Sequence, residues 1–366
     1  MAFTLHVDAS VFHGHLQHVQ TELAGVDARL TPVVKGNGYG FGRVILAKES
    51  ARLNVQRICV GTVWEVNSVV DHFPGFIHVL EPLSLSDEVT ANKWRDVLLQ
   101  YGDRVIITVS DTDLNQLTSL GVQHIIIDCA TSLHRFGLPV QSVAHVVNNL
   151  ASSIQLHGFN VHLPIAEPDK KDSNDLKSAK AQEVLALINN LREQVVGHDV
   201  PLAISVSHLT SDEIKTISTN ATNVSIDVRL GTKLWLGASG ALKVTGTVLA
   251  VHDVATSDRV GYTQTKGGKK LVVVSGGTSH GVALAAPITT SSIRKRFIAV
   301  AEGLAQATGK VRSPFVYQGS NLMFAEPPHM HVSLLWCDDP DIQVGDQLLC
   351  TVRNTTASFD AVIGLN

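Results

Sequence analysis

Short apolar runs separated by amphipathic segments fill the first part of the chain. Eight runs rich in valine, isoleucine and leucine have the length of buried strands, at residues 30–34, 57–62, 76–80, 104–109, 122–128, 154–161, 202–206 and 224–228. Segments with helical spacing of apolar residues lie between most of them, at 43–53, 63–71, 87–100, 111–120, 141–150, 178–195 and 211–217. A further helix is predicted at 9–23, after the N-cap candidate Asp8.

Strands that alternate with helices in this way predict an α/β fold, a (β/α)8 barrel of the TIM type. A doubly wound open sheet is the competing interpretation, because the number of strands does not show that the sheet closes. The first strand is not followed by the Gly-x-Gly-x-x-Gly fingerprint of dinucleotide-binding open sheets, which weakens that interpretation.

The pattern changes beyond Gly240. Short strands are predicted at 244–251, 260–264, 271–274, 331–336 and 347–352, together with one helix at 291–307. This part predicts a smaller, mainly β domain, so the expected division is 1–238 for the barrel and 239–366 for the C-terminal domain. A polar stretch at 167–175 follows the sixth strand and predicts an exposed loop at the functional rim.

Composition excludes several classes of protein. The chain has 366 residues, a net charge of −4 and no long charged run, which argues against nucleic acid or an acidic membrane as a partner. Its four cysteines have no paired spacing, so we expect reduced thiols rather than a disulfide scaffold or zinc cluster. The N-terminal residues do not follow a signal-peptide pattern, and no apolar run has the ~20 residues of a membrane span. These features predict a cytoplasmic protein.

One lysine has the setting of a reactive group. The first apolar run leads into Lys35, which is followed by alternating glycines and then by the helical segment at 43–53. A strand would therefore place Lys35 at its carboxyl end, beside backbone that can approach a phosphate closely. A partly desolvated lysine can act as a nucleophile or form a Schiff base. A surface lysine in a glycine-rich loop is the alternative.

The sequence of this stretch, VVKGNGYGFG at residues 33–42, resembles the lysine motif of the alanine racemase family. The resemblance implies a pyridoxal 5′-phosphate (PLP) cofactor on a fold type III barrel. It makes Lys35 the residue that forms the Schiff base and Tyr39 a ligand of the cofactor phosphate. It also implies a homodimer, since the family shares its sites across subunits.

Basic and hydroxyl-bearing residues follow the later strands of the predicted barrel. They are Arg135, His162, Ser207, Ser211, Arg229 and Thr232, and Gly231 lies among them with a backbone N–H to donate. Loops after the seventh and eighth strands commonly bind phosphate in such barrels, so Ser207, Ser211, Gly231 and Thr232 are candidate phosphate ligands. Each is also an ordinary cap or turn residue when taken alone.

Three of these residues match positions of the same family. The segment HRFG at 134–137 is similar to a family segment that makes Arg135 a partner of the cofactor's phenolic oxygen or of the substrate. His162 matches a histidine near the pyridine ring, with a satisfied core histidine as the alternative. Arg229 matches the arginine that donates to the pyridine nitrogen, and because arginine keeps its proton the ring would be a weak electron sink.

The resemblance breaks at the second catalytic base. A racemase needs one proton-carrying group on each face of the substrate carbon, and the family uses a tyrosine of the C-terminal domain beside the lysine. The corresponding stretch here is SGGTSHG at 275–281, which has no tyrosine. His280 is the candidate replacement, because its ordinary pKa lies in a useful range. A turn histidine without a catalytic role is an equally good interpretation.

The sequence therefore supports three functional hypotheses. The leading one is a PLP-dependent amino-acid racemase or epimerase for a small amino acid, with Lys35 and His280 as its catalytic residues and no metal. The second is a D-amino-acid lyase or dehydratase with a metal at His329 and His331, because a His-x-His pair on a strand shares one face. The third is a PLP-binding paralogue that has lost the second base.

Overall fold

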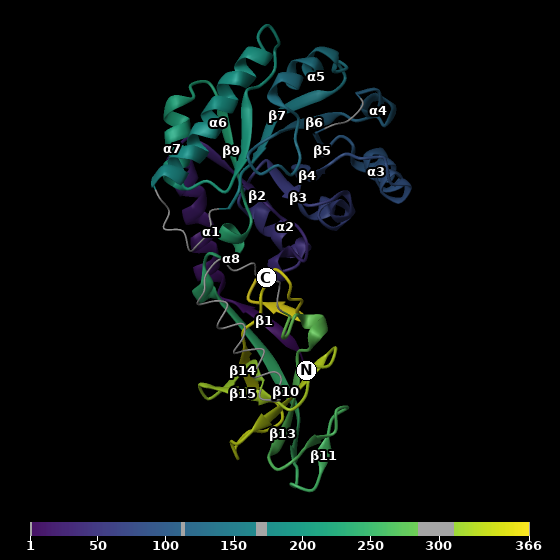
Figure 1. Ribbon diagram of the computed structural model, residues 1–366, viewed down its shortest axis with the longest axis vertical. Helices are drawn as coiled ribbons and strands as arrows, with labels where there is room; N and C mark the ends of the chain where they lie inside the picture. The colour runs from purple at the N-terminus through teal and green to yellow at the C-terminus, as the bar shows by residue number, and fades with distance from the viewer. Residues whose placement is uncertain (1, 111–113, 166–173, 285–310, 366) are drawn as a thin grey trace. The chain divides into compact units, whose positions relative to one another are not determined.

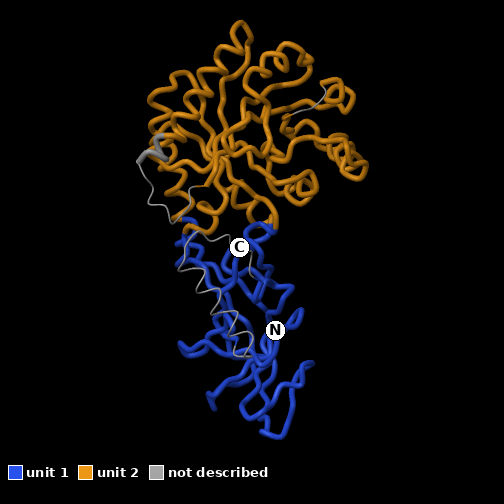
Figure 2. Tube along the Cα trace, in the orientation of Figure 1, with its two compact units in different colours: residues 1–13, 37–42, 238–366 blue, residues 14–36, 43–237 orange. Residues whose placement is uncertain are grey.

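The computed structural model describes residues 2–110, 114–165, 174–284 and 311–365. The chain forms two compact units, one of residues 14–36 and 43–237 and one of residues 1–13, 37–42 and 238–366 (Figure 2). The expected boundary at 238/239 stays a prediction, and residues 1–13 and 37–42 also belong to the C-terminal unit. The predicted helix at 291–307 and residues 167–173 of the predicted loop lie outside the described residues.

Eight parallel strands form the sheet of the larger unit. They are β2 (Ala28–Pro32), β3 (Arg57–Val60), β4 (Phe76–Pro82), β5 (Val105–Val109), β6 (His124–Cys129), β7 (Gln155–His162), β8 (Ala203–Ser207) and β9 (Ser225–Leu230). Their hydrogen-bonded order is β2-β9-β8-β7-β6-β5-β4-β3. A bridge between Val33 and Cys59, with the Val34 N–H donating to the Cys59 carbonyl at 2.7 Å, links the first strand to the last. The nearly closed barrel predicted from the sequence is confirmed.

The barrel strands are largely buried on both faces because helices cover the sheet from outside. Every residue of β5 and β8 is buried. The helices of this part of the chain are α1 (Ala9–Ala24), α2 (Arg43–Arg52), α3 (Glu88–Tyr101), α4 (Leu114–Ser119), α5 (Val143–Asn149), α6 (Asn174–Gln194), α7 (Ser211–Asn220) and α8 (Thr232–Leu236) (Figure 1). A 3-10 turn, η4 (Val140–Ser142), precedes α5. Side-chain caps begin α3 at Asp87 and α7 at Thr210.

The helix predicted at 63–71 is wrong in type. The segment forms two short 3-10 helices instead, η2 (Val63–Ser68) and η3 (Val70–His72). Val63, Val66 and Val69 are fully buried, and β-branched side chains restrict the helical rotamers that a longer α-helix would require. The interruption falls at Val69, which has the non-helical φ and ψ of −123° and −23°.

An eight-stranded, mainly antiparallel sheet forms the other unit, in the order β13-β16-β15-β14-β17-β10-β1-β18. Its strands are β1 (Phe3–Val7), β10 (Leu242–Asp253), β13 (Lys270–Ser275), β14 (Arg312–Tyr317), β15 (Ser320–Phe324), β16 (Val332–Cys337), β17 (Gln347–Cys350) and β18 (Ala361–Ile363). The β character of this part of the chain was predicted correctly. Strands β1, β14, β15 and β18 were missed.

Two predictions for this unit were wrong in detail. Of the strand expected at 260–264, only Val260 is in a strand: residues 261–264 form a turn between the two-residue strands β11 (Arg259–Val260) and β12 (Thr265–Lys266). Strand β16 begins at Val332, so His329 and His331 precede it and do not share one face of a strand. Within the described ranges, no helix combines the length and apolar character that crossing a membrane requires.

Candidate functional site

Lys35 lies where the first barrel strand ends. Val33 and Val34 continue the path of β2 and hold it against β3 through the bridge to Cys59, so the backbone before Lys35 is fixed on both sides. The side chain reaches solvent, yet the protein around it removes enough water to lower its pKa. The positive charges of Arg135 and Arg229 lower that pKa further, and the carboxylate of Glu65 opposes them.

Glu65 connects the backbone beside Lys35 to the end of β3. Its carboxylate accepts the N–H of Gly36 at 2.8 Å and the N–H of Gly61 at 2.7 Å. A Cβ at Gly61 would lie 3.2 Å from this carboxylate and 3.3 Å from the Cβ of Lys35, so the glycine permits the close approach. Sequence reasoning missed Glu65, because nothing in its local pattern shows that it bonds to backbone on two different strand ends.

Arg229, His162 and Ser207 form one hydrogen-bonded cluster at the carboxyl ends of β7, β8 and β9, in which Arg229 and Ser207 are buried and His162 is half-buried. Arg229 donates from Nη2 to the Val161 carbonyl at 2.9 Å and to Ser207 Oγ at 3.3 Å. Ser207 Oγ and His162 Nδ1 are 2.6 Å apart. Arg229 Nη2, which can only donate, also lies 3.4 Å from His162 Nδ1, so Nδ1 is an acceptor. The Ser207 hydroxyl therefore donates to Nδ1, and the His162 proton lies on Nε2. The structure thus brings together three of the predicted site residues.

Desolvation and positive charge keep the histidines of this cluster neutral. Burial, then Arg229 and Arg135, lower the pKa of His162 to about 3. Burial, then Arg229, lower the pKa of His208 to about 4, and the two rings lie 5.0 Å apart. Arg229 itself is 4% exposed, and its pKa falls to about 10, so it stays charged near neutral pH. His208 was not among the predicted site residues.

Arg135 is carried on a tightly closed loop after β6. Ala130 and Leu138 close the loop through bonds of 2.8 Å from the Ala130 N–H to the Leu138 carbonyl and from the Leu138 N–H to the Asp128 carbonyl. Gly137 has a φ of +114°, and a Cβ there would lie 2.5 Å from backbone atoms of the preceding strand. The loop therefore requires glycine at this position. The closed loop in turn sets the backbone position of Arg135.

Three further predicted phosphate ligands either bond to another side chain or stand at the start of a helix. Ser211 begins α7, and its hydroxyl donates to a carboxylate oxygen of Glu22. Gly231 is the N-cap of the short helix α8, and Thr232 is the first residue of that helix. The phosphate roles of these residues stay predictions, and for Ser211 that role would compete with the bond to Glu22.

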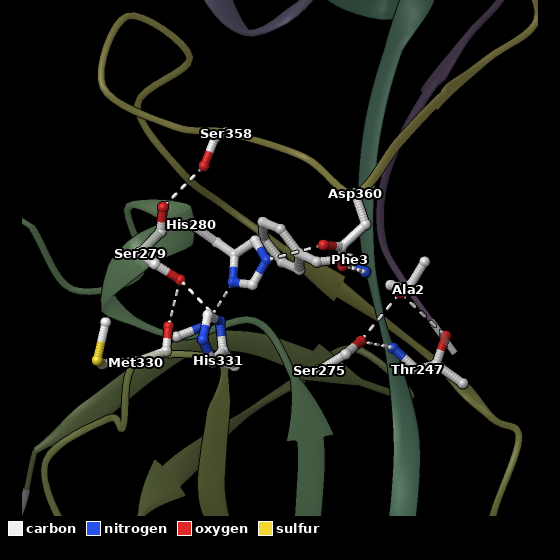
Figure 3. A network of polar contacts seen from close by, with 11 residues as sticks. Ala2, Phe3, Thr247, Ser275, Ser279, His280, Met330, His331, Ser358 and Asp360 are labelled. Carbon is white, nitrogen blue, oxygen red and sulfur yellow. Dashed lines mark hydrogen bonds and ion pairs between the residues drawn. The ribbon is translucent and has the colours of Figure 1, made fainter.

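Tyr39 and His280 belong to the C-terminal unit. Tyr39 is buried in the 3-10 segment η1 (Gly38–Gly40), with a φ of 54°. His280 is 7% exposed and has partners on both ring nitrogens. Gly277 donates its N–H to Nδ1 at 3.2 Å. On the other side of the ring, Nε2 lies 3.2 Å from Asp360 Oδ1 (Figure 3). This pattern places the proton on Nε2, and the lone pair of Nδ1 is already used.

His329 and His331 lie in different surroundings. His329 Nε2 is 2.7 Å from Glu326 Oε1, and its ring stacks on Tyr262 at 4.4 Å. His331 Nδ1 is 3.2 Å from Ser279 Oγ (Figure 3). Among the residues that the structure describes, no group of three or more His, Cys, Asp or Glu side chains is placed to hold a metal ion.

The neutral histidines predict acid sensitivity of the barrel. The folded pKa of His162, about 3, lies below the ordinary value of 6.5, so between these values the unfolded chain binds a proton that the folded chain does not. The free energy of unfolding should therefore fall as pH drops through this window, by at most about 1.4 kcal/mol per pH unit for each such proton. Urea unfolding at a series of pH values measures the slope.

In His162→Gln, the free energy of unfolding should depend less steeply on pH between 6.5 and about 3, by the contribution of one proton. His157→Gln should act in the same direction from 6.5 to about 4, the value to which burial lowers the pKa of His157. An unchanged slope in both variants would contradict the neutral state of these side chains.

Comparisons with known proteins agree with this architecture. The family model described as "Alanine racemase, N-terminal domain" matches residues 7–231. The alanine racemase of Syntrophobacter fumaroxidans is 24% identical over 180 residues, which cover 47% of this chain and 46% of that protein. The matched stretch thus spans about half the length of this curated relative.

Solved alanine racemases share the fold across both units. One from Bacillus anthracis, with bound L-Ala-P, has a TM-score of 0.68 at 16% identity and covers 95% of this chain and 84% of its own. One from Bartonella henselae, with covalently bound pyridoxal phosphate, has a TM-score of 0.64 at 16% identity, covering 96% and 90%. One from Acinetobacter baumannii has a TM-score of 0.62 at 14% identity, covering 97% and 91%.

Proposed function

This chain belongs to the alanine racemase family, and from that premise we propose that it is a PLP-dependent amino-acid racemase or epimerase acting on a small amino acid. The observation that carries the proposal is the setting of Lys35. Its pKa is lowered by partial desolvation, and it ends the first barrel strand at the same end of the barrel as the Arg229–His162–Ser207 cluster. A lysine that loses its proton easily is suited both to bonding with an aldehyde and to moving a proton.

The donor set at this end of the barrel fits pyridoxal phosphate. Arg229 offers a guanidinium that donates at every relevant pH, which suits a pyridine nitrogen that only accepts. Arg135 adds positive charge for an anionic cofactor, and the buried Asn160 Oδ1 is an acceptor that no described residue satisfies. When bound, the cofactor would supply an aldehyde for Lys35 and a conjugated ring that withdraws electrons from the substrate Cα.

Each of these site residues would have a separate role in the reaction. Lys35 would bond to the cofactor and carry the α-proton on one face. Arg229 would keep the ring nitrogen unprotonated, and neutral His162, oriented by Ser207, would support the ring without adding charge. Tyr39, Ser207, Ser211, Gly231 and Thr232 are the proposed phosphate ligands. For Ser207 this role would compete with the bond that its hydroxyl donates to His162.

We keep His280 as the candidate for the proton on the second face. Its Nδ1 lone pair accepts the Gly277 N–H, so that bond must open before Nδ1 can take a proton. The metal-dependent alternative has less support, since His329 and His331 are engaged with Glu326 and Ser279 respectively. We also propose a homodimer, which light scattering would test, and a cytoplasmic location.

Exchange of the α-proton in deuterated water tests the reaction. A panel of L- and D-amino acids is incubated with the PLP-saturated protein, and deuterium is measured in both enantiomers. We expect deuterium in both forms of at least one small amino acid, because two groups exchange protons on two faces. Exchange in one enantiomer only would rule out the two-base racemase, and release of a keto acid or aldehyde would favour the lyase.

His280→Gln sharpens this test. If His280 carries the second proton, the variant should keep exchange on the face served by Lys35 and lose interconversion of enantiomers by about a hundredfold or more. Equal losses of both activities would point to a structural role through Asp360. Ser279→Ala, beside it, is the control for local disturbance.

A further inference from the structure

The connection between β8 and α7 contains several hydroxyl groups, and each of them is engaged within the protein. Ser207 and Ser211 both donate their hydroxyl protons to other side chains. Thr210 forms a capping box with Glu213, in which the threonine hydroxyl accepts the Glu213 N–H at 3.3 Å and the Glu213 carboxylate accepts the Thr210 N–H at 2.7 Å. A ligand that used these groups would have to break bonds that the protein already makes.

His208 is the exception in this connection. The residue is exposed, and neither of its ring nitrogens has a hydrogen-bond partner among the residues that the structure describes. Its φ is +60°, in the left-handed region that residues other than glycine rarely adopt. Lys180 Nζ donates to the His208 carbonyl at 3.1 Å, and the His208 ring lies 5.0 Å from the His162 ring at an angle of 67°. A ring with free nitrogens is thus held in an unusual backbone conformation beside the proposed site.

Positive charges act on His208 from four different segments. They belong to Arg229 on β9, Lys180 on α6, Lys35 after β2 and Arg135 after β6. Burial has the largest effect, and together with these charges it lowers the pKa of His208 to about 4. The neighbouring His162, on β7, is neutral as well. The carboxylates of Glu213 and Glu22 accept bonds from the hydroxyls of the connection. An anion placed beside His208 would offset the positive charges and raise its pKa.

We propose that His208 is a ligand of the cofactor phosphate and takes up a proton from solvent when that phosphate binds. The inference rests on the proposed function, because it presupposes the cofactor at Lys35. Strand β8 is the seventh of the barrel, and the loops after the seventh and eighth strands commonly bind phosphate in such barrels. A protonated imidazole donates from both nitrogens, and its bond to a phosphate is stronger than that of a neutral donor. Phosphate binding is therefore coupled to the uptake of a proton by this residue.

A comparison of PLP with pyridoxal, which lacks the phosphate, isolates this contact. The full chain is titrated with each compound, and the affinity is measured from the absorbance of the bound form. His208→Asn keeps a residue type that tolerates a positive φ and an N–H donor, but asparagine cannot take up the proton. We expect the variant to bind PLP about tenfold more weakly at about pH 6 and to bind pyridoxal as the wild type does. Equal changes for both compounds, or no change for PLP, would overturn the proposal.

His198→Asn is the matched control. His198 is an exposed histidine that precedes β8, at the opposite end of the strand, and its replacement should leave both affinities unchanged. Wild-type protein that bound neither PLP nor pyridoxal would contradict the proposed function instead, so the two failures can be told apart.

Calorimetry gives a second measurement that needs no variant. Sulfate is a dianion that does not titrate near neutral pH, and it is added to the pyridoxal-saturated full chain in two buffers of different ionisation enthalpy. We expect sulfate to bind with net proton uptake at about pH 6, because the imidazole becomes charged beside it. Sulfate that binds without proton uptake, or that does not bind, would overturn the proposal.

Discussion

Lys35→Ala is expected to lower α-proton exchange by at least about a thousandfold, because one residue would lose both the bond to the cofactor and a proton-carrying group. The loss should appear for both enantiomers. Borohydride treatment of the wild-type protein should fix one cofactor mass to the peptide that contains Lys35, and mass spectrometry should find no such adduct in the variant. The lowered pKa of Lys35 motivates this expectation, since an uncharged amine is the reactive form.

Lys48→Ala is the matched control. Lys48 is an exposed lysine on α2 of the same unit, and its removal should leave both the adduct and the exchange rate unchanged. An adduct that persists in Lys35→Ala would contradict the assignment of the cofactor lysine. Absence of any adduct in the wild-type protein would instead contradict the cofactor itself, so the two failures can be told apart.

Glu65→Gln probes the charge that faces Lys35. The amide keeps one acceptor oxygen for the backbone but has no negative charge. In the wild-type protein the negative charge of Glu65 raises the pKa of Lys35. The variant should therefore show a lower pKa for Lys35, measured as the pH dependence of its modification by a reagent specific for amines. A pKa that stays the same would mean that the carboxylate only holds the backbone of Gly36 and Gly61.

The barrel could be predicted because its evidence is local. Strands such as β5, VIITV, are continuous apolar runs, and each of the eight predicted runs overlaps a strand of the larger unit. The helix type of the 63–71 segment was predicted wrongly, because the spacing of its apolar residues favours an α-helix whereas its β-branched valines disfavour one. Strand β1 was missed for another reason: Phe3–Val7 pairs with β10, and Phe3 lies opposite Gly246, a partner that no local pattern reveals.

The site divides in the same way. Lys35, His162 and Arg229 stand at strand ends, where the motif and the barrel rule both point to them. Glu65 could not be found, because its importance rests on two backbone bonds to residues on other segments. The engagement of both nitrogens of His280 is likewise a property of folded loops. The position of a residue along the chain identifies it as a candidate for the site. Which of its hydrogen-bonding atoms are already engaged is known only from the contacts in the folded protein.

Gly137→Ala is the second change with a large expected effect, a loss of about 3 kcal/mol in the free energy of unfolding. The methyl group would meet backbone atoms 2.5 Å away, and alanine is strained at a φ of +114°. Neither contact can relax without moving the closed loop after β6. Because Arg135 is two residues before Gly137, the same movement should weaken cofactor binding by about tenfold or more. Urea unfolding and cofactor titration measure the two effects.

Gly121→Ala separates backbone strain from collision. Gly121 also has a positive φ, of +67°, but a Cβ there would meet nothing within 4 Å. Its replacement should cost only about 1 kcal/mol and leave cofactor binding unchanged. Equal losses of stability in the two variants would mean that φ alone decides, and that the loop has room for a side chain. A larger loss at Gly137, together with weaker cofactor binding, would show that this close approach positions Arg135.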